Sequence, residues 1–234
     1  MRSPESNLQS IPTDAFSNLS RRIAESEQST PGLGLAFHSH RVSALVAHLA
    51  SVIGHEASAA RFSRAAYFHD LGKLAVPTGI LMSPDVLTSD ERAIVETHSE
   101  SGADILASSS APDGALAADI ARWHHTRFDG SGYPKGRVGS EIPLAARITA
   151  VADVYDALRS RRSYKPEETN DSALARMRTI QRAGSGFVFD PQILEALFDT
   201  NRNVSLLWDA AALCAISGSD TNSPRGRPHR RLRP

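Results

Sequence analysis

The chain has 234 residues, of which 41% are hydrophobic, and its 26 basic and 26 acidic residues leave no net charge at pH 7. This composition allows a substantial core, excludes a wholly disordered chain, and gives no global electrostatic attraction for nucleic acid or a membrane. Cys214 is the only cysteine, which excludes an internal disulfide and a cysteine-based metal cluster. With no apolar run of roughly 20 residues and no apolar signal-peptide core at the start, we expect a cytoplasmic protein.

The chain begins with a polar extension, residues 1–30, in which 15–25 is the one candidate helix. A helical apolar period that includes His38 follows, and a glycine ends it at residue 54. A second helix is predicted over about 56–72, and it would carry the unusual pair His69-Asp70 near its C-terminal end.

Lys73 comes three residues after Asp70 and four after His69, so helical geometry predicts that it lies on their side. The sequence Thr-Ser-Asp-Glu at 88–91 predicts a capped helix start, and that helix would carry His98 and end near residue 108.

Another helix is predicted over about 115–125, where it ends in the pair His124-His125. Glycines and prolines mark 128–143 as a loop without regular structure. The helix that follows, 144–160, has an apolar stripe and a separate polar face with Asp153 and Asp156.

Helices near 170–182 and 190–201 complete the main domain, residues 31–201, and no strand pattern competes with these assignments. The predicted fold class is therefore all-α. Residues 202–234 form a C-terminal segment that ends in an arginine-rich tail. Its composition is typical of a solvated, disordered tail, with nucleic acid or acidic lipid as the weaker alternative.

Five histidines and two aspartates on these segments form one candidate metal site: His38, His69, Asp70, His98, His124, His125 and Asp153. Nitrogen and carboxylate ligands without sulfur suit first-row divalent metals. The two oxygens of Asp70 can bridge two ions, and such a pair generates hydroxide at neutral pH and stabilises charge on a phosphoryl group. The pattern predicts a metal-dependent phosphodiesterase with Asp70 and Lys73 as catalytic residues, where Lys73 binds the phosphate or protonates the leaving oxygen.

These motifs resemble the HD-GYP family of the HD phosphohydrolase superfamily over roughly residues 34–198. The resemblance rests on an ordered set of motifs: His38-Ser39-His40-Arg41-Val42, His69-Asp70-Leu71-Gly72-Lys73, His98, His124-His125 with Asp129-Gly130-Ser131-Gly132-Tyr133-Pro134, Ala152-Asp153-Val154-Tyr155-Asp156-Ala157-Leu158, Arg162-Ser163-Tyr164-Lys165 and Phe189-Asp190-Pro191. It implies an HD-domain helical bundle around a binuclear metal site with iron or manganese, which hydrolyses the bacterial second messenger cyclic di-GMP to pGpG and on to GMP.

The resemblance also implies a role for each matching residue. His38, His69 and Asp153 would bind one ion and His98, His124 and His125 the other, with Asp70 as the bridge and Asp156 in support. The substrate would be contacted by Lys73, Asp129, Gly132, Tyr133, Pro134, Arg162 and Lys165.

Four positions depart from the family pattern, and none is a predicted ligand. Gly34 stands where some members have a glutamate that recruits a third metal, so two ions are predicted. Thr126 replaces the glutamate that usually follows the paired histidines, which removes a carboxylate near the site. Arg161 and Ser163 replace the usual neighbours of the substrate-binding arginine. The four departures together are expected to slow catalysis or to change the nucleotide that is preferred.

Two alternatives stay open on the sequence. The substrate could be another cyclic nucleotide such as cyclic GMP-AMP, because loops that cannot be positioned from sequence build the base pockets. The chain could instead be a degenerate module that binds the dinucleotide or a signalling protein through the loop at Gly132, Tyr133 and Pro134. Thr126 favours that second alternative, and the complete ligand set argues against it.

Overall fold

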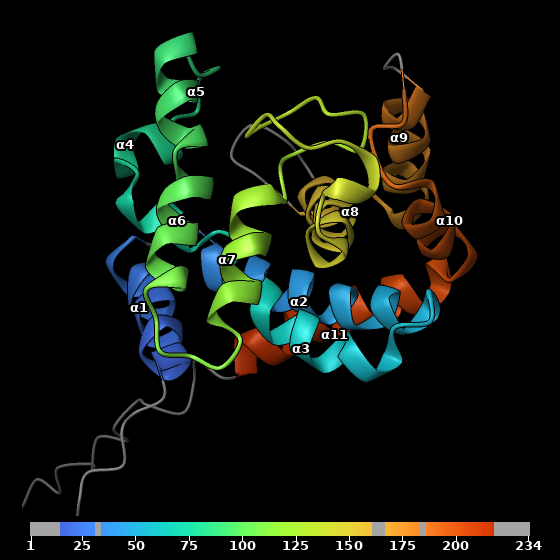
Figure 1. Ribbon diagram of the computed structural model, residues 1–234, viewed down its shortest axis with the longest axis horizontal. Helices are drawn as coiled ribbons and strands as arrows, with labels where there is room; N and C mark the ends of the chain where they lie inside the picture. The colour runs from blue at the N-terminus through green and yellow to red at the C-terminus, as the bar shows by residue number, and fades with distance from the viewer. Residues whose placement is uncertain (1–14, 31–33, 161–166, 183–185, 218–234) are drawn as a thin grey trace, which may run out of the picture.

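The computed structural model describes residues 15–30, 34–160, 167–182 and 186–217, and every regular element in these ranges is a helix (Figure 1). The predicted all-α class is confirmed. The elements in chain order are α1 (Ala15–Ser29), α2 (Leu35–Val52), α3 (Glu56–Ala66), the 3₁₀ helix η1 (Leu71–Ala75), α4 (Thr78–Leu81), α5 (Ser89–Glu96), α6 (His98–Ala107), α7 (Gly114–Trp123), the 3₁₀ helix η2 (Gly139–Glu141), α8 (Leu144–Arg159), α9 (Asn170–Arg182), α10 (Pro191–Asp199) and α11 (Asn201–Ser217).

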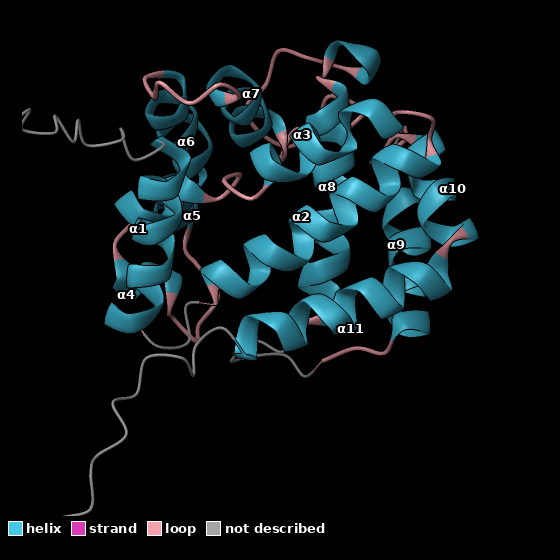
Figure 2. Cartoon of the chain, turned by 90° about the horizontal axis from the view of Figure 1, so that it is seen from below, coloured by secondary structure: helices cyan, strands magenta, loops and turns pink. Residues whose placement is uncertain are grey.

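Helix α2 is the centre of the bundle, and α1, α3, α8, α10 and α11 all contact it. Val42, Leu45, Val46 and Leu49 are fully buried on α2. Their spacing of three and four residues places them on one helix face, which is why a helix of this sequence is driven into the core. Figure 2 shows α11 lying alongside α2.

A glycine contact holds η1 against α6. A Cβ atom on Gly72 would overlap the carbonyl oxygen of His98 and would lie 2.7 Å from the backbone nitrogen of Gly102. The two backbones can approach this closely only because neither residue has a side chain. The approach brings Asp70, which directly precedes η1, beside the first residue of α6.

Two predicted helices are divided in the structure. The helix predicted over 56–72 ends at Ala66, so His69 and Asp70 lie in a turn between α3 and η1 rather than in a helix. Backbone hydrogen bonds between residues three apart, such as His69 N to Ala66 O at 3.1 Å, replace the α-helical hydrogen bonds in this turn. The helix predicted to carry His98 breaks at Thr97, although the capping box between Thr88 and Glu91 at its start is present.

Both ends of the described chain pack onto the common core. In α1, Leu19 and Ile23 are buried, and in α11 Val204 and Trp208 are buried. The division at residues 30 and 201 stays a prediction, and most of the arginine-rich tail lies outside the described residues. Within the described ranges, no helix combines the length and the apolar character that a membrane crossing requires.

Candidate metal centre

Asp70 lies at the centre of the histidine cluster, and each of its oxygens faces different imidazoles. Oδ1 is 3.3 Å from Nε2 of His98 and 3.7 Å from Nε2 of His124. Oδ2 is 3.4 Å from Nε2 of His38 and 3.5 Å from Nε2 of His69. A carboxylate with separate nitrogen ligands at each oxygen has the arrangement that a bridging ligand between two ions requires.

The first group, which we call the His38 side, consists of His38, His69 and Asp153 around Oδ2 of Asp70. The Nε2 atoms of His38 and His69 are 3.0 Å apart, and Oδ1 of Asp153 is 3.3 Å from Nε2 of His38. Ligand atoms of His38, His69 and Asp70 all lie within 4.8 Å of one another. This spacing allows one ion to contact all three.

The second group, the His124 side, consists of His98, His124 and His125 around Oδ1 of Asp70, and their ligand atoms lie within 4.8 Å of one another. Nε2 of His98, Nε2 of His124 and Oδ1 of Asp70 are buried and have no hydrogen-bond partner. A buried polar atom left unsatisfied costs about 1–3 kcal/mol, so three such atoms converging on one point fit a cation. The donor set therefore suits a divalent first-row metal.

Backbone carbonyls orient three of these rings through the other ring nitrogen. Nδ1 donates to the carbonyl oxygen of Ala66 at 2.8 Å in His69, and His124 makes the same kind of bond to Ala121 at 2.9 Å. Nδ1 of His98 lies 2.6 Å from the carbonyl oxygen three residues earlier. A proton on Nδ1 leaves the lone pair of Nε2 free for a metal ion.

His38 is held differently, by the buried carboxylate of Asp156. Nδ1 of His38 donates to Oδ2 of Asp156 at 2.7 Å. The guanidinium of Arg41 and the indole of Trp208 also donate to Asp156. Sequence reasoning proposed Asp156 as a supporting residue but missed Arg41 and Trp208, although Arg41 stands within the first motif.

Burial keeps the imidazoles of His69 and His125 neutral. It lowers the pKa of His69 to about 3 and the pKa of His125 well below its usual value, so both are neutral at pH 7. Burial alone would also lower the pKa of His38, but hydrogen bonds to Asp153, Asp156 and Asp70 outweigh it and raise that pKa well above its usual value.

The carboxylates are ionised. Burial would raise the pKa of Asp70, but the ammonium of Lys73 and the imidazoles nearby hold it well below its usual range. Burial likewise opposes ionisation of Asp153, and its hydrogen bond with His38 outweighs that effect and lowers the pKa. Nζ of Lys73 is 2.5 Å from Oδ2 of Asp70, so the predicted proximity of these two residues is confirmed, with Lys73 in the 3₁₀ helix η1 rather than in an α-helix.

The loop after α7 folds back onto the His124 side. Oγ1 of the buried Thr126 donates to the carbonyl oxygens of Pro134 at 2.8 Å and Tyr133 at 3.1 Å. Gly132 has a φ of +78°, and a Cβ there would overlap the carbonyl oxygen of His125. The ring of Tyr133 consequently lies 4.7 Å from that of His125, measured between centroids. Thr126 therefore fastens the loop to the metal centre.

In the part of the chain that it describes, the structure shows no contact between Asp129, another predicted substrate-binding residue, and the metal centre. Asp129 accepts a hydrogen bond from the backbone nitrogen of Ser131 at 2.9 Å, within its own turn. The side chain of Ser131 and, to a lesser degree, this backbone group lower the pKa of Asp129. Arg162 and Lys165 lie outside the described residues.

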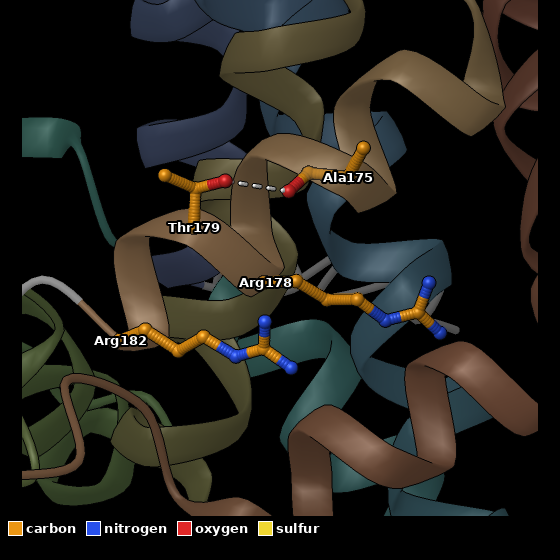
Figure 3. Close-up of a pocket in the computed structure, with 4 residues that line it drawn as sticks. All are labelled: Ala175, Arg178, Thr179 and Arg182. Carbon is orange, nitrogen blue, oxygen red and sulfur yellow. Dashed lines mark hydrogen bonds between the residues drawn. The ribbon is translucent and has the colours of Figure 1, made fainter.

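A recess of about 550 Å³ lies elsewhere, along α9. It is lined by Ala175, Arg178, Thr179 and Arg182 (Figure 3). No predicted site residue lines this recess, so the metal centre and this recess are separate features.

A family model described as an HD domain matches residues 12–193 of the chain. The cyclic di-GMP phosphodiesterase response regulator RpfG of Xanthomonas campestris is 47% identical over 133 residues, which cover 57% of this chain and 34% of that protein. A cyclic di-GMP phosphodiesterase of Thermotoga maritima is 35% identical over 193 residues, 82% of this chain and 50% of that protein. The 3′3′-cGAMP-specific phosphodiesterase 2 of Vibrio cholerae is 39% identical over 163 residues, which cover 69% of this chain and 30% of that protein.

The chain thus spans half or less of the length of these relatives. The family match extends from α1 to α10 and contains every residue of the metal centre. The chain belongs to the HD domain family, and its paired histidines with the Gly132-Tyr133-Pro134 loop place it in the HD-GYP branch.

Proposed function

We propose that the chain hydrolyses a cyclic dinucleotide, with cyclic di-GMP as substrate and pGpG and then GMP as products. The observation that carries this proposal is Asp70, whose two oxygens each face their own group of buried imidazoles. Two relatives named as cyclic di-GMP phosphodiesterases support the choice of substrate. The cofactors would be two divalent ions, iron or manganese, and the cytoplasmic location expected from the sequence belongs to the same proposal.

When bound, the two ions would supply an activated water and stabilise charge on the phosphoryl group. Asp70 would hold them at a fixed separation. Lys73 reaches Oδ2 of Asp70 from a position that is 27% exposed, so its ammonium can meet a phosphate at the edge of the site or donate a proton to the leaving oxygen. Burial raises the pKa of Tyr133, so its hydroxyl stays protonated and able to donate a hydrogen bond to the substrate.

Arg162 and Lys165 are proposed to bind substrate phosphates, because guanidinium and ammonium groups suit phosphate oxygens. Asp129, Gly132, Tyr133 and Pro134 would contact the substrate from the loop. Changing Arg162 to Ala should raise the KM while the metal content stays at two ions per chain. Unaltered kinetics in that variant would contradict its role in substrate binding.

The proposal is tested by loading purified protein anaerobically with Mn²⁺ or Fe²⁺ and measuring metal content together with turnover of cyclic di-GMP. We expect two ions per chain and a linear dinucleotide product. Two bound ions without hydrolysis of any cyclic dinucleotide would favour the alternative, a module that binds a dinucleotide or a signalling protein through the Tyr133 loop. A content near three ions would contradict the prediction from Gly34.

A second substrate is supported by one observation. The Vibrio cholerae relative that is 39% identical is named as specific for 3′3′-cGAMP. The ratio of kcat/KM for cyclic di-GMP to that for 3′3′-cGAMP, measured on the same preparation, decides between the two. A ratio below one would replace cyclic di-GMP as the proposed substrate and would leave the metal-dependent reaction in place.

A further inference from the structure

We infer that Trp208 of α11 is a positioning residue of the metal centre, which acts on His38 through Asp156. The inference rests on the proposed function, since it takes His38 to be a metal ligand. Trp208 lies outside residues 12–193, the part of the chain that the family model matches. With Trp208, the metal centre would include a residue of the C-terminal helix α11.

The contact that carries the inference is a short hydrogen bond between buried groups. Nε1 of Trp208 donates to Oδ1 of Asp156 at 2.6 Å, and the two residues are 7% and 1% exposed. Oδ2 of the same carboxylate accepts from Nδ1 of His38 at 2.7 Å. One carboxylate thus joins α11 to a predicted metal ligand on α2.

The other donors to Asp156 come from the two helices that already form the site. Arg41 on α2 donates from Nε at 2.5 Å and from Nη2 at 3.1 Å, and Ser160, at the end of α8, donates at 3.1 Å. Trp208 is the one donor to Asp156 from α11 among the contacts of the described residues. Its removal would leave Oδ1 with Arg41 alone and weaken the set of hydrogen bonds that fixes the orientation of the carboxylate.

The indole is itself fixed in place by two guanidinium groups. Cζ of Arg159 is 4.4 Å and Cζ of Arg41 is 5.2 Å from the ring centroid of Trp208. Arg159 also pairs with Asp209 at 3.2 Å, which ties α11 to α8 beside the indole. Cation–π contacts of this kind restrain the ring, so the N–H group points at Asp156 with little freedom.

A positioning role predicts an effect on one ion only. Groups that hold a metal-binding histidine set its ring orientation and its basicity, and their mutation commonly costs about 10- to 100-fold in metal affinity. His38 faces Oδ2 of Asp70, whereas His98 and His124 face Oδ1. Loss of the Trp208 hydrogen bond should therefore weaken the ion on the His38 side and spare the ion on the His124 side.

The variant that isolates the hydrogen bond is Trp208→Phe, because phenylalanine keeps an aromatic ring but lacks the N–H donor. Metal-free protein is titrated with Mn²⁺ or Co²⁺, and the two binding steps are compared. We expect about 10-fold weaker binding of one ion and less than about twofold change in the other. Leu206→Ala is the matched control, since Leu206 lies on the same helix with 68% exposure, and it should leave both affinities unchanged.

A second measurement on the wild-type chain does not depend on how the variant folds. The chain has two tryptophans, and a Trp123→Phe variant assigns their two indole N–H signals in an NMR spectrum. We expect the Trp208 signal to exchange slowly with solvent and to shift when metal is added. A rapidly exchanging Trp208 signal that ignores metal would overturn the inference.

The outcomes separate this inference from the proposed function. Wild-type protein that binds no divalent ion would refute the proposed function. Two ions in the wild type with unaltered affinities in Trp208→Phe would refute the positioning role alone. Equal loss of both ions together with a lower unfolding temperature would also refute it, because it would show that Trp208 only stabilises the fold.

Discussion

The two sides of the metal centre differ in how one imidazole is held, because His69 is oriented by a backbone carbonyl like His98 and His124, whereas His38 is not. On the His124 side, His98 and His124 are oriented by carbonyl oxygens three residues earlier in the chain. On the other side, His38 depends on Asp156, a side chain 118 residues away, and through it on Arg41. Backbone groups cannot be mutated away, whereas a carboxylate can. The His38 side should therefore be the more sensitive to substitution, even where no ligand is changed.

The largest effect is expected from Asp70→Ala, which removes the group that both sides share. The imidazoles and the single carboxylate of Asp153 that remain cannot offset the charge of two adjacent dications, so both ions should be lost. Elemental analysis of the purified variant measures this. Lys73→Met is the comparison variant: it removes the ammonium next to Oδ2 of Asp70 and should keep two ions while turnover falls. Full metal occupancy in Asp70→Ala would exclude a bridging role.

The asymmetry between the sides is tested by Asp156→Asn. The amide keeps the shape of the side chain but removes the charge that holds Nδ1 of His38, so the ion on the His38 side should bind about 10- to 100-fold more weakly. Calorimetric titration with Mn²⁺ would resolve the two steps. The control is Asp113→Asn, which neutralises a buried carboxylate paired with Arg61 and Arg64. Equal weakening of both steps in Asp156→Asn would remove the distinction between the sides.

The metal-free protein should become less stable as the pH is lowered, because of His69. Its pKa is about 3 in the folded chain against 6.5 for a free histidine, so between these values the unfolded state binds the additional proton. Lowering the pH from 6.5 to 5 should cost roughly 2 kcal/mol from this residue, at about 1.36 kcal/mol per pKa unit. The lowered pKa of His125 also makes the folded protein less stable as the pH is lowered. The raised pKa of His38 has the opposite effect, because its contribution to stability is lost as the pH rises above 6.5.

Urea unfolding at the two pH values measures this effect. His69→Asn should reduce the difference between them, because asparagine has no proton to gain. If the variant shows the same loss of stability as the wild type, His69 is not the group responsible.

The smallest effect is expected where the loop is fastened to the His124 side. Thr126→Val removes the hydroxyl that donates to the carbonyl oxygens of Tyr133 and Pro134, and a hydrogen bond of this kind contributes about 1 kcal/mol. The free energy of unfolding should fall by about that amount, and the KM should rise because Tyr133 is released from His125. Thr126→Ser retains the hydroxyl and should behave as the wild type. A full loss of metal in Thr126→Val would show that the loop holds the ligands as well.

The sequence predicted the helical class because apolar residues recur at helical spacing, and it named the residues that the structure gathers around Asp70. Their roles as ligands stay predictions. The breaks at Thr97 and after Ala66 were not predicted, because a continuous helical pattern does not show where short i to i+3 hydrogen bonds replace the α-helical ones. Both breaks place a histidine at the site.

Trp208 could not be found from sequence for a different reason. Its spacing predicts nothing about Asp156, since 52 residues separate the two. The segment around Trp208 is apolar and was assigned to the C-terminal segment rather than to the domain. Only the packing of α11 alongside α2 brings the indole to the carboxylate.

Because of the glycine contact between Gly72 and Gly102, metal binding would stabilise the packing of η1 against α6. Asp70 stands before one of these segments and His98 begins the other, so an ion that binds both would tie the two backbones together across a contact that has no side chains. Binding energy would then add to the stability of this contact. Amide protons of η1 and of the first turns of α6 should become slower to exchange as metal is added, before any effect on the distant α9.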